Sequence, residues 1–213
     1  MKNKKILLCC LIIVLVGIIN STVQAQQKND AQGIIYQLDV KKSKLFWKAP
    51  KNRHNGYILF NSGILSNFTA GWPTQGTFSI DMNSMRSTDE TTAAGRKKVD
   101  DELRSEGFFA VPQYPAATML VKQIFSDKSP NTFRVLGELT IKTVTKPIEF
   151  TAIMKQKGNI ITATANMNIS RANWNINHQP KPTSWNILDR VKDSIVDNDI
   201  PVSMELVFTK KRL

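Results

Sequence analysis

The sequence is poor in cysteine and histidine. Its 213 residues include two cysteines and two histidines, and both cysteines, Cys9 and Cys10, lie in an apolar run near the start of the chain. If that run is removed on export, no thiol is left, which excludes disulfides, thiol catalysis and cysteine-based metal sites. A zinc site would then have to combine His54 and His178 with carboxylates. Because this supply of ligands is so short, we expect no metal site.

Motifs of the common enzyme classes are also missing. The chain has no G-x-S-x-G, P-loop, G-x-G-x-x-G or H-E-x-x-H sequence. The three consecutive acids Asp100 to Glu102 would point to different faces of a helix, so we interpret them as solvated surface rather than as a catalytic pair. We therefore expect a protein that is not an enzyme, with no catalytic residues and no cofactor.

The apolar run has the anatomy of a secretory signal peptide. A lysine-rich start precedes the run Ile6–Ile19, and the small-residue pattern Val23–Ala25 follows it. The run is shorter than the roughly 20 residues that a membrane-spanning helix needs. We expect cleavage between Ala25 and Gln26 and a periplasmic or secreted protein. The expected organisation is a signal peptide at 1–25, a polar leader at 26–33 and one domain at 34–213.

Acidic residues are fewer than basic ones. The chain has 29 lysines and arginines against 17 acids, a formal net charge of +12, and it stays basic without its lysine-rich start. Such a charge favours acidic surfaces or anionic lipid head groups as neighbours, but the simpler interpretation, which we prefer, is a soluble lysine-rich surface. We expect no nucleic acid partner and allow transient contact with a membrane surface. The sequence leaves a monomer and a homodimer open.

Alternation of apolar and polar residues dominates from Ile34 onward and predicts half-buried antiparallel strands. The expected inward faces are Phe78, Ile80 and Met82; Phe133, Val135, Gly137, Leu139 and Ile141; Ile148, Phe150, Ala152 and Met154; Ile161, Ala163, Ala165, Met167 and Ile169; and Val202, Met204, Leu206 and Phe208. Further strands are expected at 34–40, 43–49, 56–70 (one strand or two) and 117–126. Eight or nine strands at hairpin spacing indicate an all-β protein, either a closed barrel or a sandwich.

Two segments have helical spacing. The first is 92–106, with Thr92 as its N-cap and Gly107 as its stop, and the second is 185–196. A tight hairpin is expected between Lys155 and Ile160, where Gly158 and Asn159 can take positive φ.

The inward faces leave two interpretations open. Methionine is flexible and suits an adaptable apolar lining, and small residues on the same faces would leave volume unfilled. The inward phenylalanines could instead fill that volume. The four methionines concerned are Met82, Met154, Met167 and Met204, and the small residues are Gly137, Ala152, Ala163 and Ala165. A ligand pocket and a packed core are therefore both compatible with the sequence.

Four blocks of sequence resemble one family in order and spacing. They are Leu38-Asp39 with Ser43-Lys44-Leu45-Phe46-Trp47; His54-Asn55-Gly56 with Phe60 and Gly63; Asp101-Glu102-Leu103-Arg104-Ser105-Glu106-Gly107-Phe108-Phe109 with Tyr114-Pro115; and Gly137-Glu138-Leu139-Thr140-Ile141-Lys142 with Thr145-Lys146-Pro147. They are similar to motifs of the YceI-like family, exported lipocalin-like proteins also called polyisoprenoid-binding proteins. The chain departs from the family at Glu102, where histidine is usual, and in its longer segment from Arg171 to Asp199.

The resemblance implies an extended antiparallel lipocalin-like barrel of about eight strands with one or two short helices at the barrel end. It implies an elongated apolar cavity for an amphiphilic lipid, either polyisoprenoid or fatty-acid-like, carried or sequestered in the cell envelope. The alternative is a packed barrel that uses its basic surface as an envelope interaction or stress module.

The candidate ligand-binding residues are the inward side chains and two phenylalanines after the first helix: Phe60, Phe78, Ile80, Met82, Phe108, Phe109, Phe133, Val135, Phe150, Met154, Ala165, Met167, Met204 and Leu206. The candidates for the polar head group are His54, Arg96, Asp101 and Arg104. Arg104 could instead pair with Glu106 or Asp101, and Phe108 and Phe109 could anchor the helix. Trp174 and Trp185 could cover a barrel end or pack there.

Overall fold

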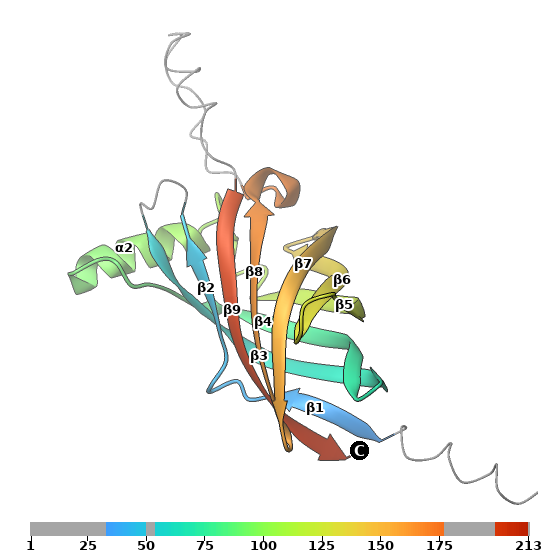
Figure 1. The fold of residues 1–213 in the computed structure, drawn as a ribbon. Helices are drawn as coiled ribbons and strands as arrows, with labels where there is room; N and C mark the ends of the chain where they lie inside the picture. Colours follow the sequence, from blue (N-terminus) through green and yellow to red (C-terminus); the bar gives the residue numbers. More distant parts are fainter. Residues whose placement is uncertain (1–32, 50–53, 177–198, 213) are drawn as a thin grey trace, which may run out of the picture. The chain divides into compact units, whose positions relative to one another are not determined.

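The computed structural model describes residues 33–49, 54–176 and 199–212. The chain divides into two units, Met1–Ile34 and Ile35–Leu213. The elements of its described residues, in chain order, are β1 (Ile34–Leu38), β2 (Lys44–Lys48), β3 (Asn55–Thr69), β4 (Trp72–Ser87), α2 (Ala93–Arg104), β5 (Ala116–Ser126), β6 (Thr132–Ile141), β7 (Val144–Lys157), β8 (Ile160–Ser170), the 3-10 helix η3 (Arg171–Trp174) and β9 (Asp199–Arg212) (Figure 1).

The strands form one antiparallel sheet that closes on itself. Its order is β3-β2-β9-β8-β7-β6-β5-β4, and β4 pairs with β3 to complete an eight-stranded ring. The strand β1 pairs with the same two neighbours as β2, namely β3 and β9. Since both run antiparallel to β3, β1 and β2 act as one broken strand. The expected barrel is confirmed, and the sandwich is excluded because no edge separates β3 from β4.

The inward faces follow the predicted alternation. On β6 the inward side chains from Phe133 to Ile141 are all less than 10% exposed, as are Val202 to Phe208 on β9. The segment that the sequence left as one strand or two is a single strand, β3, with register shifts against β4 near Leu59 and Phe60. Such irregularities bend a strand locally, which lets one long strand curve around the barrel.

The predicted hairpin between β7 and β8 is present. Lys157 pairs with Ile160, and Gly158 takes a φ of 58° as the first of the two turn residues. A glycine with positive φ at this position is the signature of a type II′ turn, whose twist matches the flanking strands. Asn159, which the sequence also allowed positive φ, keeps a negative one in this turn type, since only Gly158 of the pair is in the left-handed region.

The helix α2 begins where the sequence predicts. The Thr92 hydroxyl accepts a hydrogen bond from the Gly95 N–H and caps the first turn. The helix ends at Arg104 with Ser105 as its C-cap, before the predicted stop at Gly107, because the Ser105 N–H turns back to the Glu102 carbonyl. The second predicted helix, 185–196, lies outside the described residues. In the described part of the chain, no helix has the length and apolarity to cross a bilayer.

The burial of one acid on α2, Asp100, differs from the sequence interpretation. Asp100 was expected on solvated surface, but it is 7% exposed and its Oδ1 accepts a hydrogen bond of 2.7 Å from the Ser87 N–H at the end of β4. The carboxylate thus fastens α2 to the barrel end. Asp101, the next residue, is exposed and pairs with Lys97.

Candidate functional site

An apolar cavity of about 510 Å³ lies at the end of the barrel that α2 covers. Its wall is built from most of the strands, from α2 with the segment after it, and from η3 with Ile176. The lining residues are Leu45, Trp47, Ala49, His54, Ile58, Ile80, Met82, Met85, Val99, Glu102, Leu103, Phe108, Phe109, Ala117, Met119, Leu139, Ile141, Met167, Ile169, Arg171, Ile176, Ile200, Val202 and Met204. The size is that of ordinary small-molecule sites, about 300–1,000 Å³.

Among these described lining residues, three have ionisable side chains: His54, Glu102 and Arg171. His54 precedes β3, Glu102 lies on α2, and Arg171 opens η3 directly after β8. An apolar wall with few polar groups is the usual composition of a site that holds an apolar molecule and orients it by one end.

Arg171 is the cation of this wall. The residue is half-buried, and its Nε is fully covered without a hydrogen-bond partner. No described residue forms an ion pair with its guanidinium. Because a buried donor without an acceptor costs about 1–3 kcal/mol, an acceptor atom of a bound molecule would stabilise this side chain.

The other half of the barrel is filled by aromatic rings. The ring centroid of Phe78 lies 6.3 Å from that of Phe60 and 6.0 Å from that of Phe208, and both pairs have edge-to-face geometry. Trp72 and Phe133 pack at 4.8 Å. None of these rings is in the cavity wall, so the cavity stops short of the half of the barrel in which they lie.

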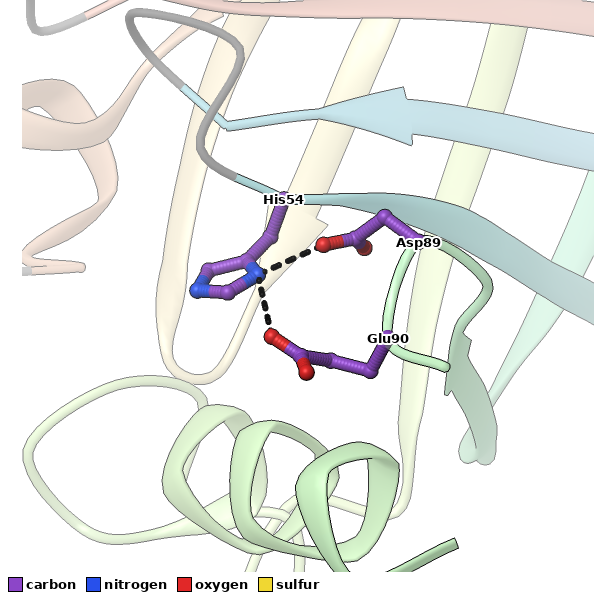
Figure 2. Close-up of side chains that lie close together, drawn as sticks. All are labelled: His54, Asp89 and Glu90. Carbon is purple, nitrogen blue, oxygen red and sulfur yellow. Dashed lines mark hydrogen bonds and ion pairs between the residues drawn. The ribbon is translucent and has the colours of Figure 1, made fainter. Parts of the chain in front are cut away.

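His54 makes a polar cluster beside the cavity (Figure 2). Its Nδ1 lies 2.8 Å from Asp89 Oδ2 and 3.7 Å from Glu90 Oε1, both on the segment that follows β4. The other oxygen of Asp89 accepts hydrogen bonds from the Asn55 N–H (2.9 Å) and the Ser87 hydroxyl (3.1 Å). In Figure 2 the second ring nitrogen of His54 points away from both carboxylates.

The charge state of Asp89 follows from these contacts. Partial burial by itself raises the pKa of the Asp89 carboxyl, but the hydrogen bonds from the Asn55 N–H, from His54 and from Ser87 outweigh it and lower the pKa to about 2. Asp89 is therefore an anion throughout the neutral range.

The family model for the YceI-like domain matches residues 36–208 of this chain. The chain belongs to the YceI-like family. No curated protein matches the sequence.

Solved structures share the fold of this YceI-like chain at low sequence identity. BcnA of Burkholderia cenocepacia is 20% identical with a TM-score of 0.58, and the match covers 80% of this chain and 98% of BcnA. A polyisoprenoid-binding domain from Saccharophagus degradans, implicated in plant cell wall breakdown, is 18% identical with a TM-score of 0.55 over 83% of this chain and 98% of that one. A Campylobacter jejuni YceI protein is 18% identical with a TM-score of 0.50, covering 72% and 82%.

The structure of this YceI-like protein separates the predicted ligand-binding residues into two groups. Six border the cavity: Ile80, Met82, Phe108, Phe109, Met167 and Met204. Eight are not in its wall: Phe60, Phe78, Phe133, Val135, Phe150, Met154, Ala165 and Leu206. All eight point inward as predicted, but they lie beyond the cavity, in the half that contains the aromatic rings. Ligand contact stays a prediction for both groups.

The four small inward residues that the sequence pattern indicated as leaving unfilled volume do not border the cavity. A Cβ added at Gly137 would lie 2.4 Å from the Leu120 carbonyl oxygen, so the missing side chain allows β5 to approach and leaves no space. Ala152, Ala163 and Ala165 are also absent from the cavity wall.

Of the four predicted head-group residues, only His54 borders the cavity. Arg96 donates to the Glu90 carbonyl (2.8 Å) and the Thr91 carbonyl (3.2 Å), where it holds the start of α2. Asp101 pairs with Lys97 on the exposed face of α2.

Arg104 was expected to contact a head group or to pair with a nearby acid. Its Nη2 instead donates a hydrogen bond of 2.7 Å to the Met85 carbonyl, which ties the end of α2 to β4. The partner is a backbone group on a strand distant in sequence, so charge pairing along the helix could not predict it.

Two cavity residues were missed as head-group candidates. Glu102, where the chain departs from the family, and Arg171, where its longer segment begins, both border the cavity. The position of Arg171 at the end of a strand with an inward apolar face was a usable signal, because the last residues of a barrel strand surround the barrel mouth.

Trp174, expected at a barrel end, is 3% exposed and donates from its Nε1 to the Leu139 carbonyl at 3.0 Å. Trp185 lies outside the described residues.

Proposed function

We propose that this protein binds an amphiphilic lipid, polyisoprenoid or fatty-acid-like, with its aliphatic chain in the cavity. The observation that carries the proposal is the cavity of about 510 Å³ with a predominantly apolar wall. Burial of an aliphatic chain there contributes roughly 0.8 kcal/mol for each CH₂ group, so affinity does not require many polar contacts. The polyisoprenoid-binding domain of similar fold supports the same class of ligand.

The polar end of the lipid would lie near Arg171 and His54. Both border the cavity, and Arg171 has no anionic partner among the described residues. A carboxylate or phosphate would neutralise the guanidinium and accept its hydrogen bonds, which favours an acidic head group over a neutral one. Lipid binding of this kind needs neither a catalytic step nor a cofactor.

The proposed setting is the cell envelope. The sequence from Met1 to Ala25 supports export, and the basic charge of the chain supports transient contact with anionic membrane surfaces, where a carrier would load or release lipid. Carriage or sequestration of lipid between membranes is the role that combines these features.

The proposal is tested by what the protein carries after purification without detergent. Organic extraction followed by mass analysis should give one class of amphiphilic lipid, and native mass spectrometry should show the same mass on the folded chain. A chain that carries no lipid and takes up none from vesicles would contradict the proposal. It would favour the alternative role, an envelope interaction module with a basic surface.

Two alanines provide matched variants for this test. Ala117 borders the cavity and Ala165 lies in the packed half, although both are buried, at 3% and 5% exposed. We expect Ala117→Trp to abolish lipid uptake with little change in thermal midpoint, because the ring enters empty space. Ala165→Trp should cost about 1–3 kcal/mol of unfolding free energy by overpacking and leave the cavity open. Loss of uptake in Ala165→Trp alone would contradict the assignment of the cavity.

A further inference from the structure

Two carboxylates converge on one ring nitrogen beside the cavity. The Nδ1 of His54 is 2.8 Å from Asp89 Oδ2 and 3.7 Å from Glu90 Oε1 (Figure 2). Nδ1 carries at most one hydrogen, so it can donate to one of the two carboxylates and leaves the second without a hydrogen bond from the ring. A cation in place of that hydrogen would contact all three side chains at once.

Asp89 is held in place by the backbone around it. Its Oδ1 accepts from the Asn55 N–H and the Ser87 hydroxyl, which leaves Oδ2 directed toward His54. Outer hydrogen bonds of this kind orient the carboxylate ligands of protein metal sites.

Among the described residues, the Glu90 carboxylate has one ion-pair contact, the 3.7 Å approach of its Oε1 to His54 Nδ1, whereas the Glu90 backbone carbonyl accepts a hydrogen bond from Arg96. Its carboxylate occupies space above the first turn of α2, where a Cβ on Gly95 would lie 2.7 Å from Glu90 Oε2. A side chain at this position would therefore displace the end of the Glu90 side chain from its place beside His54.

We propose that His54, Asp89 and Glu90 bind one divalent transition-metal ion, with Zn²⁺ as the probe. Their donor atoms all lie within 4.8 Å of one another, close enough to share one ion after small side-chain rotations. One imidazole nitrogen with two carboxylate oxygens suits Zn²⁺, whereas Ca²⁺ and Mg²⁺ prefer oxygen alone. Three protein ligands leave a fourth position open. This site needs one histidine and not both.

The proposal does not rest on lipid binding, and it is tested with Zn²⁺ alone. The full chain is used with Cys9→Ser and Cys10→Ser, so that no thiol competes for the ion. We expect isothermal titration to give one Zn²⁺ per chain. His54→Ala should weaken Zn²⁺ binding at least tenfold, because even the loss of a residue that only hydrogen-bonds to a metal ligand typically weakens binding by about 10–100-fold. The matched control is His178→Ala, which removes the other histidine of the chain and should leave the affinity unchanged.

Two variants keep the result independent of folding. Glu90→Gln removes a ligand that holds no part of the described backbone, and Gly95→Ala favours the helix while displacing the Glu90 carboxylate. Both should weaken Zn²⁺ binding at least tenfold with the thermal midpoint of the metal-free protein unchanged or raised. In NMR spectra, Zn²⁺ should shift the ring signals of His54 and leave those of His178 in place.

Three outcomes of the experiments with Zn²⁺ would overturn the proposal. They are no binding at one equivalent of Zn²⁺, loss of binding in His178→Ala, and full binding in both Glu90→Gln and His54→Ala. Equal affinity for Ca²⁺ or Mg²⁺ would also overturn it, because the imidazole nitrogen would then have no role as a ligand.

Discussion

At the scale of single residues, the cavity is defined by the side chains that interrupt its apolar wall. Arg171 is the cation among them, and its covered Nε has no acceptor. His54 has the opposite surroundings, since two carboxylates lie within 4 Å of its ring. One side of the cavity mouth therefore favours an anion, and the cluster beside it favours a cation.

Replacing Arg171 by glutamine should weaken the binding of a fatty acid about tenfold or more and leave a fatty alcohol of the same chain length nearly unaffected. The reason is that a hydrogen bond between charged partners contributes about 1.5–3 kcal/mol, and the alcohol never forms it. Fluorescence displacement titrations with the two ligands measure the difference. Arg134→Gln serves as the control, since Arg134 is 57% exposed and lies outside the cavity wall. Equal losses for acid and alcohol would contradict the assignment of the head-group position.

Asp39 stabilises the break between β1 and β2 in a way that depends on pH. The hydrogen bond from the Lys42 side chain, with the Lys41 and Lys42 N–H groups, lowers the pKa of the Asp39 carboxyl below 3.8. A lowered pKa means that the charged form stabilises the folded state; this contribution is complete above pH 3.8 and is lost as the pH falls through the folded pKa.

We therefore expect Asp39→Asn to reduce the free energy of unfolding at pH 7 and to differ less from the parent as the pH falls below 3.8. Urea unfolding of both proteins at pH 7, 4 and 3 measures this difference. A gap that widens toward pH 3 would mean that the carboxylate destabilises the fold.

At the scale of elements, the barrel depends on long hairpins, and the longest joins β3 to β4. Thr69 pairs with Trp72, and both turn residues have positive φ, 50° at Ala70 and 83° at Gly71. This is a type I′ turn, which favours Asn-Gly. Alanine is strained there, because the left-handed region costs an L-residue with a Cβ roughly 1–2 kcal/mol.

Ala70→Asn should raise the free energy of unfolding by up to about 1 kcal/mol, since asparagine adopts the left-handed conformation at lower cost. Gly71→Ala in the same turn should lower it, which makes the pair a test of the turn type. Urea denaturation with an unchanged m-value measures both effects. An unchanged Ala70→Asn protein would mean that the turn is not strained.

At the scale of the whole molecule, one end of the barrel is packed and the other is hollow. The rings of Phe60, Phe78 and Phe208 close the core below, and α2 with η3 and the segment after α2 surrounds the space above. The cavity is thus shorter than the barrel.

Export is the prediction that concerns the chain as a whole. The protein recovered from the envelope of an expressing bacterium should begin at Gln26, because Val23 and Ala25 form the small-residue pattern behind the apolar run. Intact mass measurement reads the N-terminus directly. Recovery of the envelope protein with Met1 retained, or with acyl groups on Cys9 or Cys10, would contradict cleavage at this site.

Several features of the fold could be predicted from the sequence because they depend on neighbouring residues. Alternation along each strand assigned the inward side chains, Thr92 marked the start of α2, and Gly158 marked a hairpin. These are properties of a few consecutive residues, governed by backbone geometry and hydrogen bonding within a turn or along a strand. The motifs shared with the YceI-like family then distinguished a barrel from a sandwich.

Only the tertiary structure decided where along the barrel each inward residue lies. Alternation separates inward from outward side chains but carries no information on their position along the barrel axis. The sequence therefore cannot distinguish Met204, which borders the cavity, from Leu206, which does not. The position of a residue along the barrel axis follows from the register between strands, and its distance from the cavity follows from which end of the barrel α2 covers. The cluster of His54 with Asp89, 35 residues apart, has the same origin, since the pairing of β3 with β4 brings the ends of both strands together.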